Sequence, residues 1–170
     1  MGLFRRRRAD PLRQLTLLVF INAIQKDVDH IEIRWMKKAD IPPGEGGYLD
    51  LDKLDADDSV AAIFYAQGRK RWIEMAPPAK LLGPMIDLLM GWCGFEDTFL
   101  GRKAYNGDFT LSTGTRDASM PEFVRCRMRI GRPDGEPPNA FIELLEATPP
   151  PEPDEPAAPP RKRRFGFGFN

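Results

Sequence analysis

The sequence predicts an α+β domain in which a mostly antiparallel sheet is combined with two main helices. Three observations support this class. Two segments repeat apolar residues with the period of a helix, a larger number alternate with the period of a strand, and short turn sequences join the strands. The chain has 170 residues, of which 42% are hydrophobic, and this suffices for one domain with its own core.

Composition divides the chain into three parts. Residues 1–10 form a basic arm, and residues 11–146 carry all of the periodic hydrophobic pattern. In residues 147–170, prolines are mixed first with acidic and then with basic residues. The proline-rich stretch has too few apolar groups to offset its chain entropy, so we expect a disordered tail.

The first element is a helix predicted over residues 11–26, with Pro11 in its first turn. Its apolar stripe follows i, i+3, i+4, i+7 spacing and consists of Leu17, Phe20, Ile21, Ile24 and Val28, widened by Leu15 and Val19.

A half-buried strand is predicted next, over residues 31–36. Ile31, Ile33 and Trp35 alternate there with polar or longer side chains. Residues 60–67 and 70–75 then predict a hairpin around Gly68.

The second helix carries one apolar face made of Leu82, Met85, Ile86, Leu89 and Cys93. Pro84 either lies near the start of this helix or kinks it. A short strand is predicted over residues 109–112. Residues 123–130 and 140–145 predict two strands joined by the turn Pro133-Asp134-Gly135.

The sequence predicts neither an enzyme nor a cofactor or metal site. It has no glycine-rich phosphate loop ending in Lys-Ser or Lys-Thr, no dinucleotide-binding glycine pattern and no serine in a nucleophile elbow. His30 is the single histidine, which leaves no set of histidines for a metal. Cys93 and Cys126 lie in apolar segments, so we expect two reduced thiols in the core.

The candidate binding residues are basic. In the strand over residues 123–130, alternation places Arg125, Arg127 and Arg129 on one face. Three guanidinium groups at about 6.6 Å spacing repel one another unless an anionic group lies beside them. The row is therefore either the solvent-facing side of an amphipathic strand or a surface for an anion or an acidic partner.

The sequence resembles a known family in several pieces that follow in the same order. Residues 23–33 match a helix that runs into a strand, and residues 63–76 with Pro77-Pro78 match a strand pair before a helix. Residues 93–96 match the turn after that helix. Residues 102–109 share the pattern Arg-x-x-x-x-Gly-x-Phe. Together they resemble the domain that precedes the motor domain in the ATPases of type II secretion and type IV pili.

This resemblance implies a PAS-like fold that packs on a motor domain within a ring. It also implies that Arg102, together with Arg125 or Arg127, approaches the nucleotide bound by that motor. Asp108 departs from the arginine that the family has there. Because residues 1–170 contain no Walker motif, the resemblance implies docking to a motor ATPase and not ATP hydrolysis.

Two functions follow as hypotheses. The first is a non-catalytic accessory or regulatory domain of a type II secretion or type IV pilus-like system. Its tail would be a short anchor made of Arg161, Lys162, Arg163, Arg164, Phe165, Phe167 and Phe169. The alternative is binding to an anionic membrane or to nucleic acid through the basic arms.

We also predict a cytoplasmic location, with peripheral attachment to the inner membrane left open. The apolar run over residues 15–24 is half the roughly 20 residues that a membrane-spanning helix needs.

Overall fold

The computed structural model describes residues 10–42, 53, 55, 58–95, 104–113, 121–131 and 135–146. The predicted tail, nearly all of the basic arm, Arg102 and most of the Pro133-Asp134-Gly135 turn lie outside these residues. The described elements are α1 (Pro11–Gln25), β1 (His30–Lys37), η1 (Lys38–Asp40), β2 (Ser59–Gln67), β3 (Lys70–Met75), η3 (Ala79–Leu81), α2 (Leu82–Trp92), β4 (Ala104–Ser112), β5 (Phe123–Gly131) and β6 (Asn139–Glu146).

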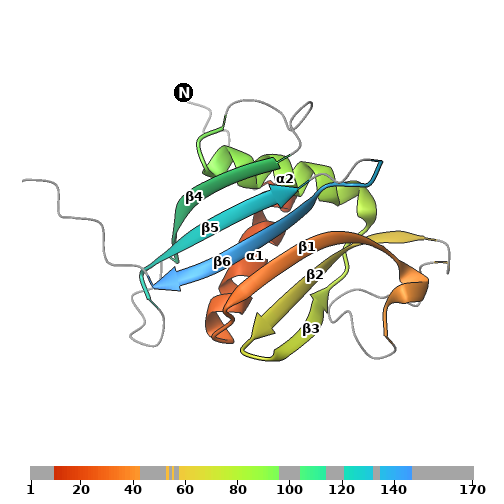
Figure 1. Ribbon diagram of the computed structural model, residues 1–170, viewed down its shortest axis with the longest axis horizontal. Helices are drawn as coiled ribbons and strands as arrows, with labels where there is room; N and C mark the ends of the chain where they lie inside the picture. Colours follow the sequence, from red (N-terminus) through yellow and green to blue (C-terminus); the bar gives the residue numbers. More distant parts are fainter. Residues whose placement is uncertain are drawn as a thin grey trace, which may run out of the picture.

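One sheet organises the fold. Its six strands lie in the order β3-β2-β1-β6-β5-β4, and every neighbouring pair is antiparallel. Both helices pack on the same face of the sheet (Figure 1). The predicted α+β class, with a mostly antiparallel sheet and two main helices, is confirmed. The opposite face, called here the open face, has no helix of the described chain across it.

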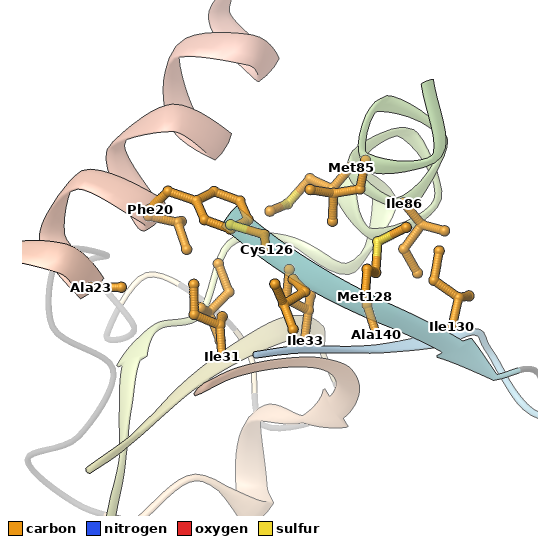
Figure 2. Packing of buried hydrophobic residues seen from close by; sticks show 14 of the residues in the cluster. Phe20, Ala23, Ile31, Ile33, Met85, Ile86, Cys126, Met128, Ile130 and Ala140 are labelled. Carbon is orange, nitrogen blue, oxygen red and sulfur yellow. The ribbon is translucent and has the colours of Figure 1, made fainter. Parts of the chain in front are cut away.

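The core fills the space between the helices and the sheet. Figure 2 shows Phe20 of α1 and Met85 of α2 directed toward strand residues such as Ile33 and Met128. All four of these side chains are buried, as are the neighbouring inward positions of the central strands. Tyr65 donates its hydroxyl hydrogen to the carbonyl oxygen of Val19, which joins β2 to α1 inside this layer.

Helix α1 starts as predicted, and Val19, Phe20 and Val28 of the predicted stripe are buried, but the buried face is shifted toward Thr16 and Ala23. Asp10 caps it by accepting a hydrogen bond from the backbone N–H of Leu12. Its buried residues are Thr16, Val19, Phe20 and Ala23, whereas Leu17, Ile21 and Ile24 are only half-buried. Thr16 tolerates burial because its hydroxyl donates to the carbonyl oxygen of Leu12 at 2.9 Å. In α2, Pro84 is the third residue, so it lies near the start of the helix.

Strand β4 is longer than the strand that the sequence predicts over residues 109–112. It begins at Ala104, and all nine of its residues pair with β5. The sequence pattern does not predict the first half of this strand, because Asn106, Gly107 and Asp108 are of residue types that are depleted in strands. Gly107 points inward, where a Cβ would lie 2.9 Å from Cβ and Sγ of Cys93.

The predicted burial of Trp35 in β1 is wrong. Ile31 and Ile33 are fully buried, but Trp35 is 37% exposed. Pairing between β1 and β6 ends at Ile33 and Ala140. In the same register Pro138 would face Trp35, and a proline has no backbone N–H to continue the ladder. The second half of β1 therefore has no neighbour in β6.

Within the described residues, no helix combines the length and apolar character needed to cross a membrane.

Candidate docking surface

Strand β5 presents the three predicted arginines on the open face. Arg125, Arg127 and Arg129 have side chains that are 51–58% exposed. The alternating residues Val124, Cys126, Met128 and Ile130 are buried on the helix side. The predicted two-sided character of this strand is thus confirmed.

Two carboxylates from the neighbouring strands lie among these arginines. Asp108 of β4 and Glu143 of β6 both lie opposite Arg127 in the strand register. Their carboxylate oxygens lie 3.6 and 3.9 Å from guanidinium nitrogens of Arg127, respectively. Asp108 also accepts a hydrogen bond from Arg125, and Glu143 accepts one from Arg129 at 3.2 Å. We call these five residues the arginine face.

The predicted repulsion among the guanidinium groups is thus relieved within the chain. Each arginine faces at least one carboxylate, so no external anion is needed to hold the row in place. Exposed pairs of this kind each contribute roughly 0–1 kcal/mol to stability, because water competes for both charges. Three positive charges against two negative ones still leave the arginine face with an excess of one positive charge.

Aromatic rings continue this surface across β6, β1 and β2. The guanidinium of Arg129 lies 4.9 Å from the ring centre of Phe141, and the ring centre of His30 lies 4.7 Å from the same point. Farther along, Arg34 and Arg71 lie over Phe64 at 4.6 and 4.1 Å.

Glu32 connects these two arginines. It accepts a hydrogen bond from Arg71 and lies 3.7 Å from Arg34. The open face therefore carries arginine, carboxylate and aromatic side chains from β5 to β1, and at β2 the ring of Phe64 is buried beneath Arg34 and Arg71.

A groove opens beside the second half of β1, where β6 does not reach. Its volume is about 620 Å³. We call it the Trp35 groove, and its lining consists of Glu32, Arg34, Trp35, Met36, Asp40, Gly135, Glu136, Pro137 and Asn139. The buried Nε of Arg34 has no hydrogen-bond partner within the described part of the chain. Acidic side chains and an exposed indole thus share one concave site.

The two cysteines are free, and neither lies on the open face. Burial, with a smaller contribution from the nearby Cys93, raises the pKa of Cys126 to about 12. Burial, with a smaller contribution from the negative charge of Asp108, raises the pKa of Cys93 to about 11. Both thiols therefore stay protonated near neutral pH, and a protonated thiol is a poor nucleophile.

Among the described residues, no three His, Cys, Asp or Glu side chains are grouped in a way that could hold a metal ion. Arg102 and the tail anchor residues fall outside the described chain, so their roles stay predictions.

Sequence reasoning found the arginines but not their partners. Asp108 is visible in the sequence only as a departure from the family pattern, and Glu143 as the single charge inside an apolar strand. The register of β5 with both neighbours is what brings them together. Glu143, a charged residue inside an otherwise apolar predicted strand, was the signal in the sequence that could have indicated a partner for these arginines.

No protein-family model matches this chain, and a search of curated proteins finds no match either.

Proposed function

We propose that this chain is a non-catalytic docking domain and that the arginine face is the surface that contacts its partner. The observation that carries the proposal is the continuous set of arginine–carboxylate pairs and stacked rings across the open face. Protein interfaces are enriched in arginine and aromatic residues and depleted in lysine. None of the described strand positions on the open face is a lysine.

The weak ion pairs suit exchange with a partner. Because each exposed pair stabilises the fold by at most about 1 kcal/mol, an incoming carboxylate can replace Asp108 or Glu143 at little cost. Planar guanidinium groups then offer paired hydrogen bonds to the new carboxylate. We infer a protein partner with exposed acidic side chains among neutral ones.

The same surface is less suited to nucleic acid. A phosphate backbone that approached Arg127 would also meet the carboxylates of Asp108 and Glu143. Nucleic-acid affinity depends on neutralising several phosphates with unpaired cations. A partner whose charges vary in sign fits this face better.

The identity of the partner rests on the family resemblance. Residues 23–33 and 102–109 support a relation to the motor-preceding domain of secretion and pilus ATPases. On this basis the chain is an accessory or regulatory component of a type II secretion or type IV pilus-like system, and its partner is the motor ATPase. It acts at the cytoplasmic side.

A second proposal rests on the basic arms. Residues 5–8 and 161–164 are basic, and each run lies beside a phenylalanine. Near an anionic lipid surface each such charge contributes about 1 kcal/mol to binding. Binding to an anionic membrane or to nucleic acid through these arms is the alternative function.

Salt dependence separates the two proposals. We would capture partners of the full chain from native lysate at low and at moderate salt, and identify them by mass spectrometry. The docking proposal predicts that a secretion- or pilus-type ATPase is retained at both salt concentrations. Retention of only nucleic acid or lipid, lost at moderate salt, would favour the arms instead.

A further inference from the structure

The open face changes its charge along β6. Near the end of this strand Leu145 pairs with Arg125, and toward its start the register passes Arg127 and Arg129. Beyond the start of β6 lies the Trp35 groove, whose lining has three acidic side chains, Glu32, Asp40 and Glu136, against the one basic side chain of Arg34. From the end of β6 to its start, the surface is thus first basic and then acidic.

The segment that follows β6 carries the opposite order of charge. Residues 152–155 contain three acidic side chains and no basic one. Residues 161–164 are all basic, and Phe165 follows them directly. If this segment turned back along β6, its acidic residues 152–155 would meet the arginine face. Its basic residues 161–164 would meet the acidic side chains of the Trp35 groove.

The connecting chain is long enough for this return. The eight residues of β6 span about 25 Å at roughly 3.3 Å per residue. Residues 147–160, which include seven prolines, reach about 43 Å at roughly 3.1 Å per residue. The basic part can therefore reach the Trp35 groove with chain to spare for a reversal after Glu146.

An exposed ring in the groove fits an aromatic peptide. Trp35 is one of the two large apolar side chains of the described chain that are clearly exposed, and it lies with Pro137 in the groove lining.

We propose that residues 147–170 fold back over the open face of their own domain. Residues 152–155 then lie along the arginine face, and residues 161–165 lie in the Trp35 groove. The tether favours this intramolecular contact over a second copy, because short linkers give effective concentrations in the millimolar range. The inference goes beyond the proposed function, since it makes the tail an internal competitor that a partner has to displace.

Paramagnetic relaxation enhancement in the full chain tests this contact. Gly166→Cys provides a site for a nitroxide label, and the two native thiols react slowly because burial raises the pKa of both. We expect the amide signals of Trp35, Met36 and Glu136 to lose most of their intensity at low salt. The loss should recover at about 1 M salt, where the screening length is about 3 Å.

Charge variants localise the contact. Asp40→Lys combined with Glu136→Lys should restore most of the lost intensity, because both changes place positive charge in the Trp35 groove. Asp87→Lys is the matched control, since Asp87 is exposed on α2 and lies outside the groove lining. It should leave the intensity loss unchanged.

Three results would overturn the inference. The first is no intensity loss on the domain, and the second is a loss at the hollow lined by Ile24 and Val28 instead of the groove. The third is an equal loss when the label and the isotope are on separate chains, which would mean docking between copies. None of these measurements needs a partner, so their failure is distinct from failure of the docking function.

Discussion

Cys126 lies among the buried side chains of β5, and Cys93 lies half-buried at the end of α2. Burial keeps both thiols protonated in the folded chain beyond the pH at which they ionise when unfolded, with pKa values of about 12 and about 11. The unfolded chain thus releases these protons first. The free energy of unfolding falls as the pH rises from about 9 toward 11.

We predict that neither thiol reacts appreciably with an aromatic disulfide reagent at pH 8 in the native protein, while both react after unfolding in denaturant. Reactivity follows the thiolate fraction, and raised pKa values keep that fraction small. Counting released thiolate by absorbance is the measurement. Fast modification of either cysteine before unfolding would contradict the packing described for α2 and β5.

A second prediction concerns the buried carboxylate of Glu74, which is 5% exposed. It accepts hydrogen bonds from Lys26 Nζ at 2.6 Å and from Trp72 Nε1 at 3.0 Å. Lys26→Met should lower the free energy of unfolding by about 1–2 kcal/mol, because a buried acceptor loses a charged donor but Lys26 is itself partly exposed.

Denaturant titration of Lys26→Met, Glu74→Gln and the double variant measures this coupling. The double variant should lose less stability than the sum of the two single variants, because the two side chains interact directly. Strict additivity of the two losses would mean that the ion pair between α1 and β3 contributes nothing.

At the scale of elements, the contact between β4 and the end of α2 depends on Gly107. A Cβ there would lie 2.9 Å from Cβ and Sγ of Cys93 and 3.0 Å from the ring of Phe95. Gly107→Ala should lower the free energy of unfolding by about 1–3 kcal/mol, the usual range for an overpacked core.

Gly91→Ala is the matched control on α2. A Cβ at Gly91 meets nothing within 4 Å, and alanine favours a helix over glycine by about 0.5–1 kcal/mol. This variant should therefore be slightly more stable than the parent in urea titration. Equal stability changes in the two glycine variants would show that Cys93 and Phe95 do not pack closely on β4.

The elements that sequence predicted well are those where one periodic pattern dominates. β5 alternates apolar and basic residues over its whole length, and the hairpin of β2 and β3 has Gly68 at its turn, with a positive φ of 58°. The sequence predicts β4 too short, because the inward position at residue 107 is a glycine and not a large apolar residue. There the partner side chains Cys93 and Phe95 fill the space that a large residue usually takes.

The burial of β2 on both of its sides could not be predicted from the pattern of residues within this strand alone. Residues 60–66 are all buried, since one side faces the helices and the other forms a second small cluster with Ile73 and Ala76. Met36 and Ile41 pack on this cluster. A strand buried on both sides has no alternation to detect, so its depth in the sheet depends on tertiary neighbours.

At the scale of the whole molecule, the sequence predicts the arginines but not the pairing that determines their role. Arg125, Arg127 and Arg129 are found from one strand, while Asp108 and Glu143 come from the two strands beside it. Strand order and register are non-local, and the local pattern does not contain them. The two carboxylates therefore largely neutralise the arginine row within its own sheet, an arrangement that the pattern of one strand does not reveal.

The two proposals give the open face two roles. We propose that it is the docking surface for a protein partner and that residues 147–170 compete with that partner for it. Both roles use the same arginine–carboxylate pairs, which are weak enough to be exchanged. A partner that binds the arginine face should therefore release the tail, and relaxation enhancement at the Trp35 groove should decrease when the partner is added.

The proposed contact between the arginine face and the partner can be tested by measuring the affinity of the proposed motor ATPase for matched variants of the full chain. Arg127→Ala removes the arginine that pairs with both carboxylates, and Lys80→Ala removes an exposed charge of η3 away from this face. In calorimetry at moderate salt, we predict that Arg127→Ala weakens binding at least about ten-fold, which corresponds to roughly 1.4 kcal/mol, while Lys80→Ala leaves it unchanged. Equal affinity of the two variants, with both still folded, would contradict the proposed contact.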